Sequence, residues 1–137
     1  MTADKKEILR VENQGLNFIF NNQRGTDAVV FVNTLVKEAV NLSASDILLE
    51  PRAKDLLVRF RIDGVLYVCG TLSLETYEAV VSRLKVMAKL DPSEKRKIQE
   101  GQFSVESRGG NINLRVEIVQ TVNGEFAFIR VHEMNTV

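Results

Sequence analysis

The sequence has a single cysteine, Cys69, so no disulfide bond can form within the chain. Disulfides are typical of oxidising compartments, and their absence favours a reducing one. Cys69 lies in an alternating, strand-like segment, where we expect a buried structural thiol rather than a reactive one. His132 is the only histidine, and no cysteine and histidine residues have metal-ligand spacing. We therefore expect no metal site, and His132 at the surface or at the end of a strand.

An excess of charge of one sign is also lacking, because 18 lysines and arginines balance 18 aspartates and glutamates. A neutral chain has no overall attraction to nucleic acid or to an anionic membrane. No apolar run has the length of a signal peptide or approaches the about 20 residues of a membrane-spanning helix. We expect a soluble cytoplasmic protein that does not bind nucleic acid.

The motifs of common catalytic sites are missing as well. There is no Gly-x-x-x-x-Gly-Lys-Ser/Thr loop to hold a nucleoside triphosphate, and the pair Gly109-Gly110 fits a hairpin turn better. No serine or cysteine has a recognisable general base. Glu50 and Asp63 do not form an acid–base pair in this interpretation, because Asp63 is already explained by a turn. We predict that this chain alone is not an enzyme.

What the sequence does contain is the pattern of one α+β domain, consistent with 137 residues of which 45% are hydrophobic. Apolar residues at helical spacing predict helices over 28–41, capped by Thr26 or Asp27, and from Ser73 to near residue 90. Alternation predicts strands at 47–50, 57–62, 65–69, 102–106, 112–119 and 126–131. Asp63-Gly64 fits a type I′ hairpin turn. The order α-β-β-β-α-β-β-β predicts an antiparallel sheet with its helices on one face.

The first 25 residues are mostly polar and are predicted to be a linker or arm, followed by one domain over 26–137. The arm holds one apolar island, Leu16, Phe18, Ile19 and Phe20. This island docks on its own domain, or else on a neighbouring chain or on a part of the protein outside this sequence.

Arginines on strands are the most distinctive polar feature. Arg59, Arg61 and Arg115 each occupy the polar phase of an alternating segment, and guanidinium groups on a rigid sheet suit phosphate or carboxylate recognition. The alternative is a solvated sheet surface, with these arginines paired to Glu117 or Asp46.

Two lysine-containing features are weaker signals. Lys85 and Lys89 are predicted on the polar side of the second helix. The run Lys95-Arg96-Lys97 is either an anion site or part of a solvated loop.

Several segments together resemble a known family. They are Ala44-Ser45-Asp46-Ile47 with Glu50-Pro51, the run Val58 to Leu66, the run Ser82 to Asp91, Leu114-Arg115-Val116, and Gly124-Glu125. In order and spacing, over about residues 26–131, they resemble the N-terminal domain that immediately precedes the ATPase domain in the GspE/PilB family. Members of that family are the cytoplasmic motors of type II secretion and type IV pilus assembly.

The resemblance implies a PAS-like domain that sits on a RecA-like ATPase domain of the same polypeptide, within a hexameric ring. Its further implied partners are neighbouring subunits and the inner-membrane secretion or pilus platform, which gives a cytoplasmic location peripheral to that membrane. ATP and Mg belong to the parent protein and no cofactor to this chain, since ATP binds between the two domains. Rigid-body rotation between them transmits the stroke.

Arginines of the N-terminal domain approach the ATP phosphates in this family, as an arginine finger does. Arg115 matches one of these positions, whereas Gln102 stands at the other, where the family usually has arginine. Arg59 and Arg61 are interdomain or surface candidates.

Other departures from the family are Leu48 in place of histidine and Glu117-Ile118-Val119-Gln120 in place of Ser-Thr-x-Pro. Together with Gln102, they indicate a divergent motor, or a paralogue in which the domain mainly mediates assembly. We expect a fragment of a longer motor. The alternatives are a free-standing PAS-like interaction module, or a ligand sensor, that works without nucleotide.

Overall fold

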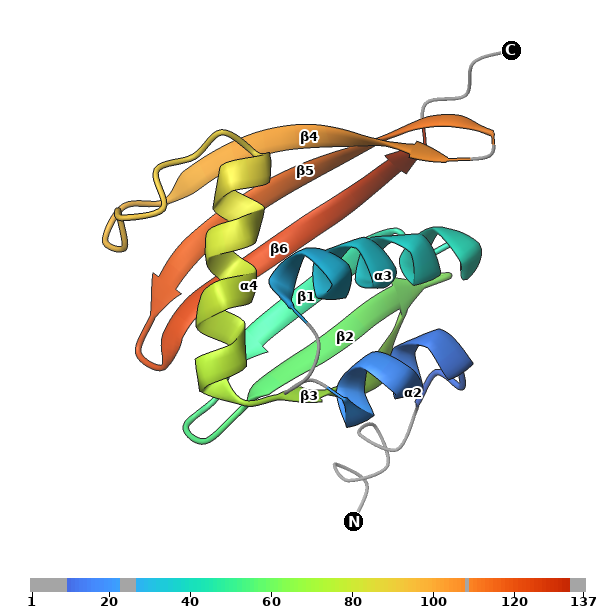
Figure 1. The fold of residues 1–137 in the computed structure, drawn as a ribbon, viewed down its shortest axis with the longest axis horizontal. Helices are drawn as coiled ribbons and strands as arrows, with labels where there is room; N and C mark the ends of the chain where they lie inside the picture. Colours follow the sequence, from blue (N-terminus) through green and yellow to red (C-terminus); the bar gives the residue numbers. More distant parts are fainter. Residues whose placement is uncertain (1–9, 23–26, 108, 134–137) are drawn as a thin grey trace.

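The computed structural model describes residues 10–22, 27–107 and 109–133 (Figure 1). The helices are α2 (Gln14–Asn21), α3 (Ala28–Asn41) and α4 (Leu74–Met87). The strands are β1 (Asp46–Pro51), β2 (Leu56–Ile62), β3 (Val65–Leu72), β4 (Gln99–Ser107), β5 (Gly110–Thr121) and β6 (Gly124–Glu133). The α+β class and the predicted element order are confirmed, with α2 as an addition at the start.

The strands form one six-stranded sheet in the order β3-β2-β1-β6-β5-β4. Every neighbouring pair is antiparallel. Strands β1, β2 and β3 follow one another in the chain, as do β4, β5 and β6, so the sheet consists of two meanders joined where β1 pairs with β6. This junction brings residues about 80 positions apart in the sequence into register.

Local sequence signals account for the ends of the elements. Asp63 and Gly64 have positive φ angles of 51° and 79°, as expected of the predicted hairpin turn. Asp27 caps α3 through a 2.8 Å hydrogen bond that its carboxylate accepts from the backbone N–H of Val30. Ser73 caps α4 by accepting from the backbone N–H of Thr76.

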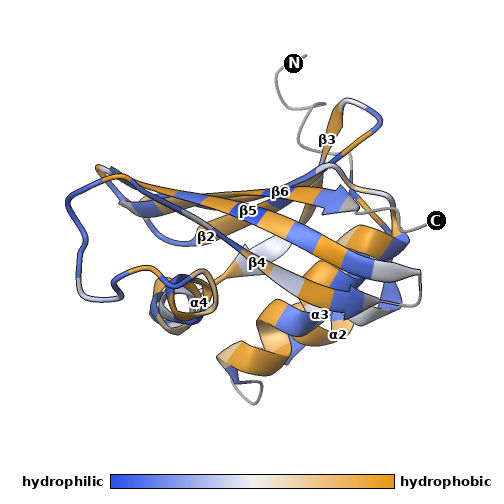
Figure 2. Ribbon diagram, turned by 90° about the horizontal axis from the view of Figure 1, so that it is seen from above, coloured by the Kyte–Doolittle hydropathy of each residue, from blue (hydrophilic) through white to orange (hydrophobic). Residues whose placement is uncertain are grey.

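The three described helices lie on one face of the sheet, and no described helix covers the other face, which we call the open face (Figure 2). Between helices and sheet lies one core, which includes Phe31, Leu35, Ile47, Phe60, Leu84 and Leu114. Cys69 belongs to this core, and its burial raises the pKa of its thiol from 9.0 to about 12. His132 is exposed on β6. Both residues are placed as the sequence predicts.

The apolar island near the N-terminus forms α2 and docks on this same domain. Leu16 and Ile19 are each 1% exposed, whereas Phe18 between them is 63% exposed. The ring of Phe20 packs edge-on against Phe31 of α3. It also lies over Gly70 of β3, where an added Cβ would come within 2.6 Å of the ring. The division of the chain at residue 25 remains a prediction.

Lys85 corrects one expectation, because it is buried and not on a polar face. It is 1% exposed, and its Nζ lies 2.6 Å from a carboxylate oxygen of Glu125. The same Nζ donates a hydrogen bond to the backbone carbonyl of Glu94. Lys89, by contrast, is exposed and lies beyond the end of α4 with a φ of 61°.

Candidate functional site

A line of polar side chains crosses the open face of the sheet. Strand pairing sets Arg61 on β2 opposite Asp46 on β1, and Asp46 opposite Arg130 on β6. The line continues through Arg115 on β5 to Gln102 on β4. We call these five residues the arginine row. It brings together Arg115, Gln102 and Arg61 of the four residues singled out from the sequence.

Asp46 is the centre of the arginine row and is almost fully buried, with 4% of its side chain exposed. Its Oδ2 lies 3.3 Å from Nε of Arg61 and accepts a hydrogen bond from Oγ of Ser45 at 2.9 Å. Its Oδ1 accepts a hydrogen bond from Nε of Arg130 at 3.1 Å. A carboxylate tolerates such burial only when it is paired and hydrogen-bonded. The two guanidinium groups therefore explain why an aspartate can occupy the middle of the sheet.

Arg115 and Gln102 form the other end of the row, and both are exposed. Among the residues that the structure describes, Arg115 makes no hydrogen bond or ion pair. The side-chain carbonyl of Gln102 accepts a 3.2 Å hydrogen bond from Nδ2 of Asn113. A hollow of about 430 Å³ is lined here by Gln102, Arg115 and Arg130, among others. The guanidinium of Arg115 is thus available to a ligand.

Arg59 and Arg61 are both engaged in ion pairs. Arg59 lies two residues before Arg61 on β2, next to the arginine row. Its Nη2 donates a 2.7 Å hydrogen bond to a carboxylate oxygen of Glu50. Its Nε is buried and has no hydrogen-bond partner in the described structure. Arg61 pairs with Asp46, which is the solvated-surface alternative set out from the sequence. Their interdomain role remains a prediction.

The residues that depart from the family pattern lie next to the row. Leu48 is 7% exposed and faces Phe128 across the β1–β6 junction, so an apolar contact replaces the family's histidine. Glu117 lies two residues beyond Arg115 on β5 and faces Glu100 on β4. Two acidic side chains, Glu117 and Glu100, therefore lie next to the Arg115 end of the arginine row.

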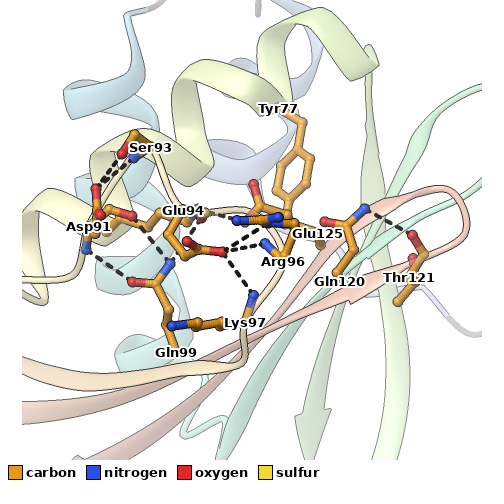
Figure 3. Close-up of polar contacts among 11 residues, drawn as sticks. Tyr77, Asp91, Ser93, Glu94, Arg96, Lys97, Gln99, Gln120, Thr121 and Glu125 are labelled. Atoms are coloured by element: carbon orange, nitrogen blue, oxygen red, sulfur yellow. Dashed lines mark hydrogen bonds and ion pairs between the residues drawn. The ribbon is translucent and has the colours of Figure 1, made fainter.

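The charged loop before β4 is held by its own hydrogen bonds (Figure 3). The carboxylate of Glu94 accepts from the backbone N–H groups of Arg96 and Lys97, and these bonds lower the pKa of that carboxyl group. The side chain of Gln99 bridges backbone groups of Asp91 and Glu94. Lys95, Arg96 and Lys97 are exposed. These contacts and exposures are those expected if Lys95-Arg96-Lys97 is part of a solvated loop. That this run binds an anion remains a prediction.

Sequence reasoning missed Arg130. It lies in the segment 126–131, which is apolar on both sides, so its charge drew no attention. The available signal was its phase, because Phe126, Phe128 and Arg130 alternate with the buried Ala127 and Ile129. That phase assigns Arg130 to the open face. Its pairing with Arg115 and Asp46 depends on strand order, which the phase does not give.

Within residues 10–22, 27–107 and 109–133, no group of three or more His, Cys, Asp or Glu side chains is arranged to hold a metal ion. In the same ranges, none of the helices has the length and apolar character needed to cross a membrane.

Comparison with known proteins points to one family. The family model described as "Type II/IV secretion system protein" matches residues 22–137. The type IV pilus assembly ATPase PilB of Myxococcus xanthus is 36% identical over 130 residues, covering 94% of this chain and 23% of that protein. The type II secretion system protein E of Xanthomonas campestris pv. campestris is 41% identical over 106 residues, covering 77% and 19%.

The type II secretion system protein E of Pseudomonas aeruginosa is 42% identical over 100 residues, covering 73% of this chain and 20% of that protein. The chain thus spans about a quarter or less of the length of these curated relatives.

Proposed function

The chain belongs to the type II/IV secretion system protein family, and from this premise we propose that it is a non-catalytic domain of a secretion or pilus assembly ATPase. In this proposal, residues 26–137 form one domain that precedes a RecA-like ATPase domain in the same polypeptide. The names of the relatives, which include type II secretion and type IV pilus proteins, support this assignment.

The proposed role is to couple ATP turnover to secretion or to pilus assembly. ATP with Mg binds between the two domains of the parent protein, and the open face of this sheet meets the nucleotide. The parent protein forms a hexamer, contacts the inner-membrane platform and lies on the cytoplasmic side. A rigid sheet suits this coupling role because its strands are hydrogen-bonded to their neighbours. The sheet therefore moves as one unit when the domain rotates.

One observation carries the proposal: Arg115 presents an exposed guanidinium that has no partner within the described chain. It projects from β5, which is paired on both sides, so its backbone is fixed. A preorganised cation of this kind stabilises the charge that develops on a transferring phosphoryl group. Gln102 lies directly opposite and offers an uncharged hydrogen-bond donor to the same ligand.

The test uses the parent protein, in which a P-loop motif is expected beyond residue 137. We expect the change Arg115→Ala to lower ATP turnover by about a hundredfold, the scale seen when one preorganised donor to a transition state is removed. Arg115→Lys keeps the charge but loses the planar fork, and we expect an intermediate loss.

The matched control is Arg52→Ala. Arg52 is also a surface arginine, paired with Asp55 at 2.7 Å, but it follows the far end of β1. Its removal should leave turnover unchanged. Turnover that is the same in the Arg115→Ala variant and in the wild type would remove the proposed role of Arg115.

A further inference from the structure

We propose that the outer side of β4 is a docking strand, and that its partner is an extended protein segment in which basic and apolar residues alternate. β4 is the last strand on one side of the sheet. We call its side that faces away from β5, over residues 100–106, the β4 edge. This surface is the rim of the sheet, and it takes a partner other than the nucleotide of the proposed function.

The two edges of the sheet differ in how well they are protected. At the β3 edge, the register with β2 shifts between Val58 and Arg59, as it does at a β-bulge. The backbone N–H of Val11 also donates a 3.2 Å hydrogen bond to the carbonyl of Val68 on β3. Bulges and covering segments are common means of keeping an edge strand from pairing with another chain. The β3 edge is therefore partly blocked.

The β4 edge has none of these protections within the described residues. β4 spans nine residues and pairs with β5 without a shift in register. It contains no lysine and no proline, which are the residues that most often guard an edge. No described helix or strand lies beyond it (Figure 1). On such a strand, every second residue directs its N–H and C=O groups away from the sheet, where another strand can pair with them.

A hollow of about 560 Å³ lies at the β4 edge. Met87, Lys89 and Phe103 line it from the helix side of the sheet, and Gln102 and Ser104 line it from the open face. Because residues of both faces line the same hollow, it lies at the rim itself, beside the backbone of β4. Phe103 is 9% exposed, and it offers an apolar contact to the side chains of an added strand.

The side chains of β4 give an added strand two different environments. On the helix side, Phe103 and Val105 belong to or pack against the apolar core. On the open side, Glu100 and Glu106 are exposed, and β4 has no basic residue. Side chains of an added strand alternate between the same two faces. Apolar residues on its helix side and basic residues on its open side therefore complement β4 best.

The same two glutamates disfavour a second copy of this chain as the partner. Two β4 strands that pair antiparallel must keep their faces matched, so only residues of the same phase lie opposite each other. If the pairing is centred on Phe103, Glu100 lies directly opposite Glu106 of the second copy. If it is centred on Gln102 or Ser104, these glutamates are diagonal neighbours. Like charges so placed destabilise the pair, whereas basic side chains compensate the glutamates.

The test uses the 137-residue chain and a synthetic peptide as long as β4 in which lysine and valine alternate. Binding is measured by fluorescence anisotropy at physiological ionic strength, where distant charges are screened. We expect saturable binding, and binding weaker by about tenfold or more when glutamate replaces the lysines of the peptide.

Charge reversal in the protein gives the reciprocal test. We expect Glu100→Lys combined with Glu106→Lys to weaken binding of the lysine–valine peptide by about tenfold or more. The glutamate–valine peptide should bind this variant better than it binds the wild type. The matched control is Glu75→Lys combined with Glu78→Lys, which reverses two exposed charges near the start of α4 and should leave binding unchanged.

Backbone pairing is tested separately from charge. A lysine–valine peptide that is methylated at every backbone amide keeps its charge but cannot donate hydrogen bonds, and we expect no binding. In hydrogen-exchange NMR, the unmethylated peptide should slow exchange of the β4 amide protons that point away from β5. Equal binding of the methylated peptide, or unchanged exchange in β4, would mean that the contact is electrostatic attraction without strand addition, and the inference would be wrong.

Other partners give different results. If the chain alone forms dimers in sedimentation experiments and the lysine–valine peptide does not dissociate them, a second copy covers the β4 edge and the inference is wrong. If the lysine–valine and glutamate–valine peptides bind equally well, the partner is not selected by basic residues, which also contradicts the inference. None of these measurements involves Arg115, so the proposed function is decided by its own test.

Discussion

Lys85 shows at the scale of one residue that charge is a poor guide to the face of a helix. Lys85 lies within α4, four residues after the buried Val81 and eight after the buried Tyr77, so its helical phase places it on the buried face. Lys89, one turn further along the chain, lies beyond the end of α4 at Met87 and has a φ of 61°. The side chain of Lys85 instead reaches Glu125 at the start of β6 and the carbonyl of Glu94 in the loop.

This burial gives a prediction for stability. Removing one partner of a buried ion pair leaves the other charge uncompensated, which typically costs about 3–5 kcal/mol. We expect Lys85→Met to lower the free energy of unfolding by about this amount, because Glu125 is only 10% exposed and would lose its cation. The measurement is urea denaturation of the 137-residue chain.

The control for this prediction is the double variant Lys85→Met, Glu125→Gln, which removes both charges. It should recover much of the lost stability, since replacing a whole buried pair is often close to neutral. Equal stability of the wild type and the Lys85→Met variant would show that the pair contributes nothing to folding.

At the same scale, the strand arginines were identified because alternation gives the face of each residue. Alternation does not give the partner. Arg61 and Arg115 have the same phase, yet one is paired with a buried aspartate and the other has no partner within the described chain. The difference arises from β6, which places Arg130 between Asp46 and Arg115.

Among the elements, α2 was the one that the sequence did not predict as a helix. It spans eight residues, too few for helical periodicity to emerge, and isolated helices of this length are unstable in water. Tertiary contacts stabilise it. Asn13 caps its first turn and also donates a hydrogen bond to Glu38 of α3 at 2.9 Å. Longer elements with clear periodicity, such as α3 and β5, were predicted.

The docking of α2 can be tested with two substitutions in the same helix. Leu16 is 1% exposed, and we expect Leu16→Ala to lower the free energy of unfolding by about 2–5 kcal/mol, the usual cost of such a cavity. Phe18 is 63% exposed, so Phe18→Ala should have little effect. Denaturation of both variants checks this, and two equal losses would contradict the observed orientation of α2.

For the whole molecule, the feature that the sequence could not supply is the junction between β1 and β6. Each meander follows from local signals, because neighbouring strands joined by short turns pair with each other. Nothing in the alternation of β1 or β6 says that these two strands are neighbours. The arginine row depends on that junction, so the candidate site was only partly predictable.

The stability of the whole domain should fall at alkaline pH, because two core residues are held protonated. Burial raises the pKa of Cys69 to about 12. Burial, together with the negative charge of Glu125, raises the pKa of Tyr77 above its ordinary value of 10.0. Tyr77 also donates a hydrogen bond from its hydroxyl to the backbone carbonyl of Glu125, which requires the protonated form.

The direction of this effect follows from proton binding. Above about pH 9 the unfolded chain releases these protons while the folded chain keeps them, so the folded state binds more protons and stability falls as pH rises. We expect the free energy of unfolding to decline steadily between about pH 8 and pH 11 in urea titrations. Cys69→Ala and Tyr77→Phe should each make the decline shallower, because each removes one titrating group. A free energy of unfolding that stays constant over this range would mean that neither group is protected in the folded core.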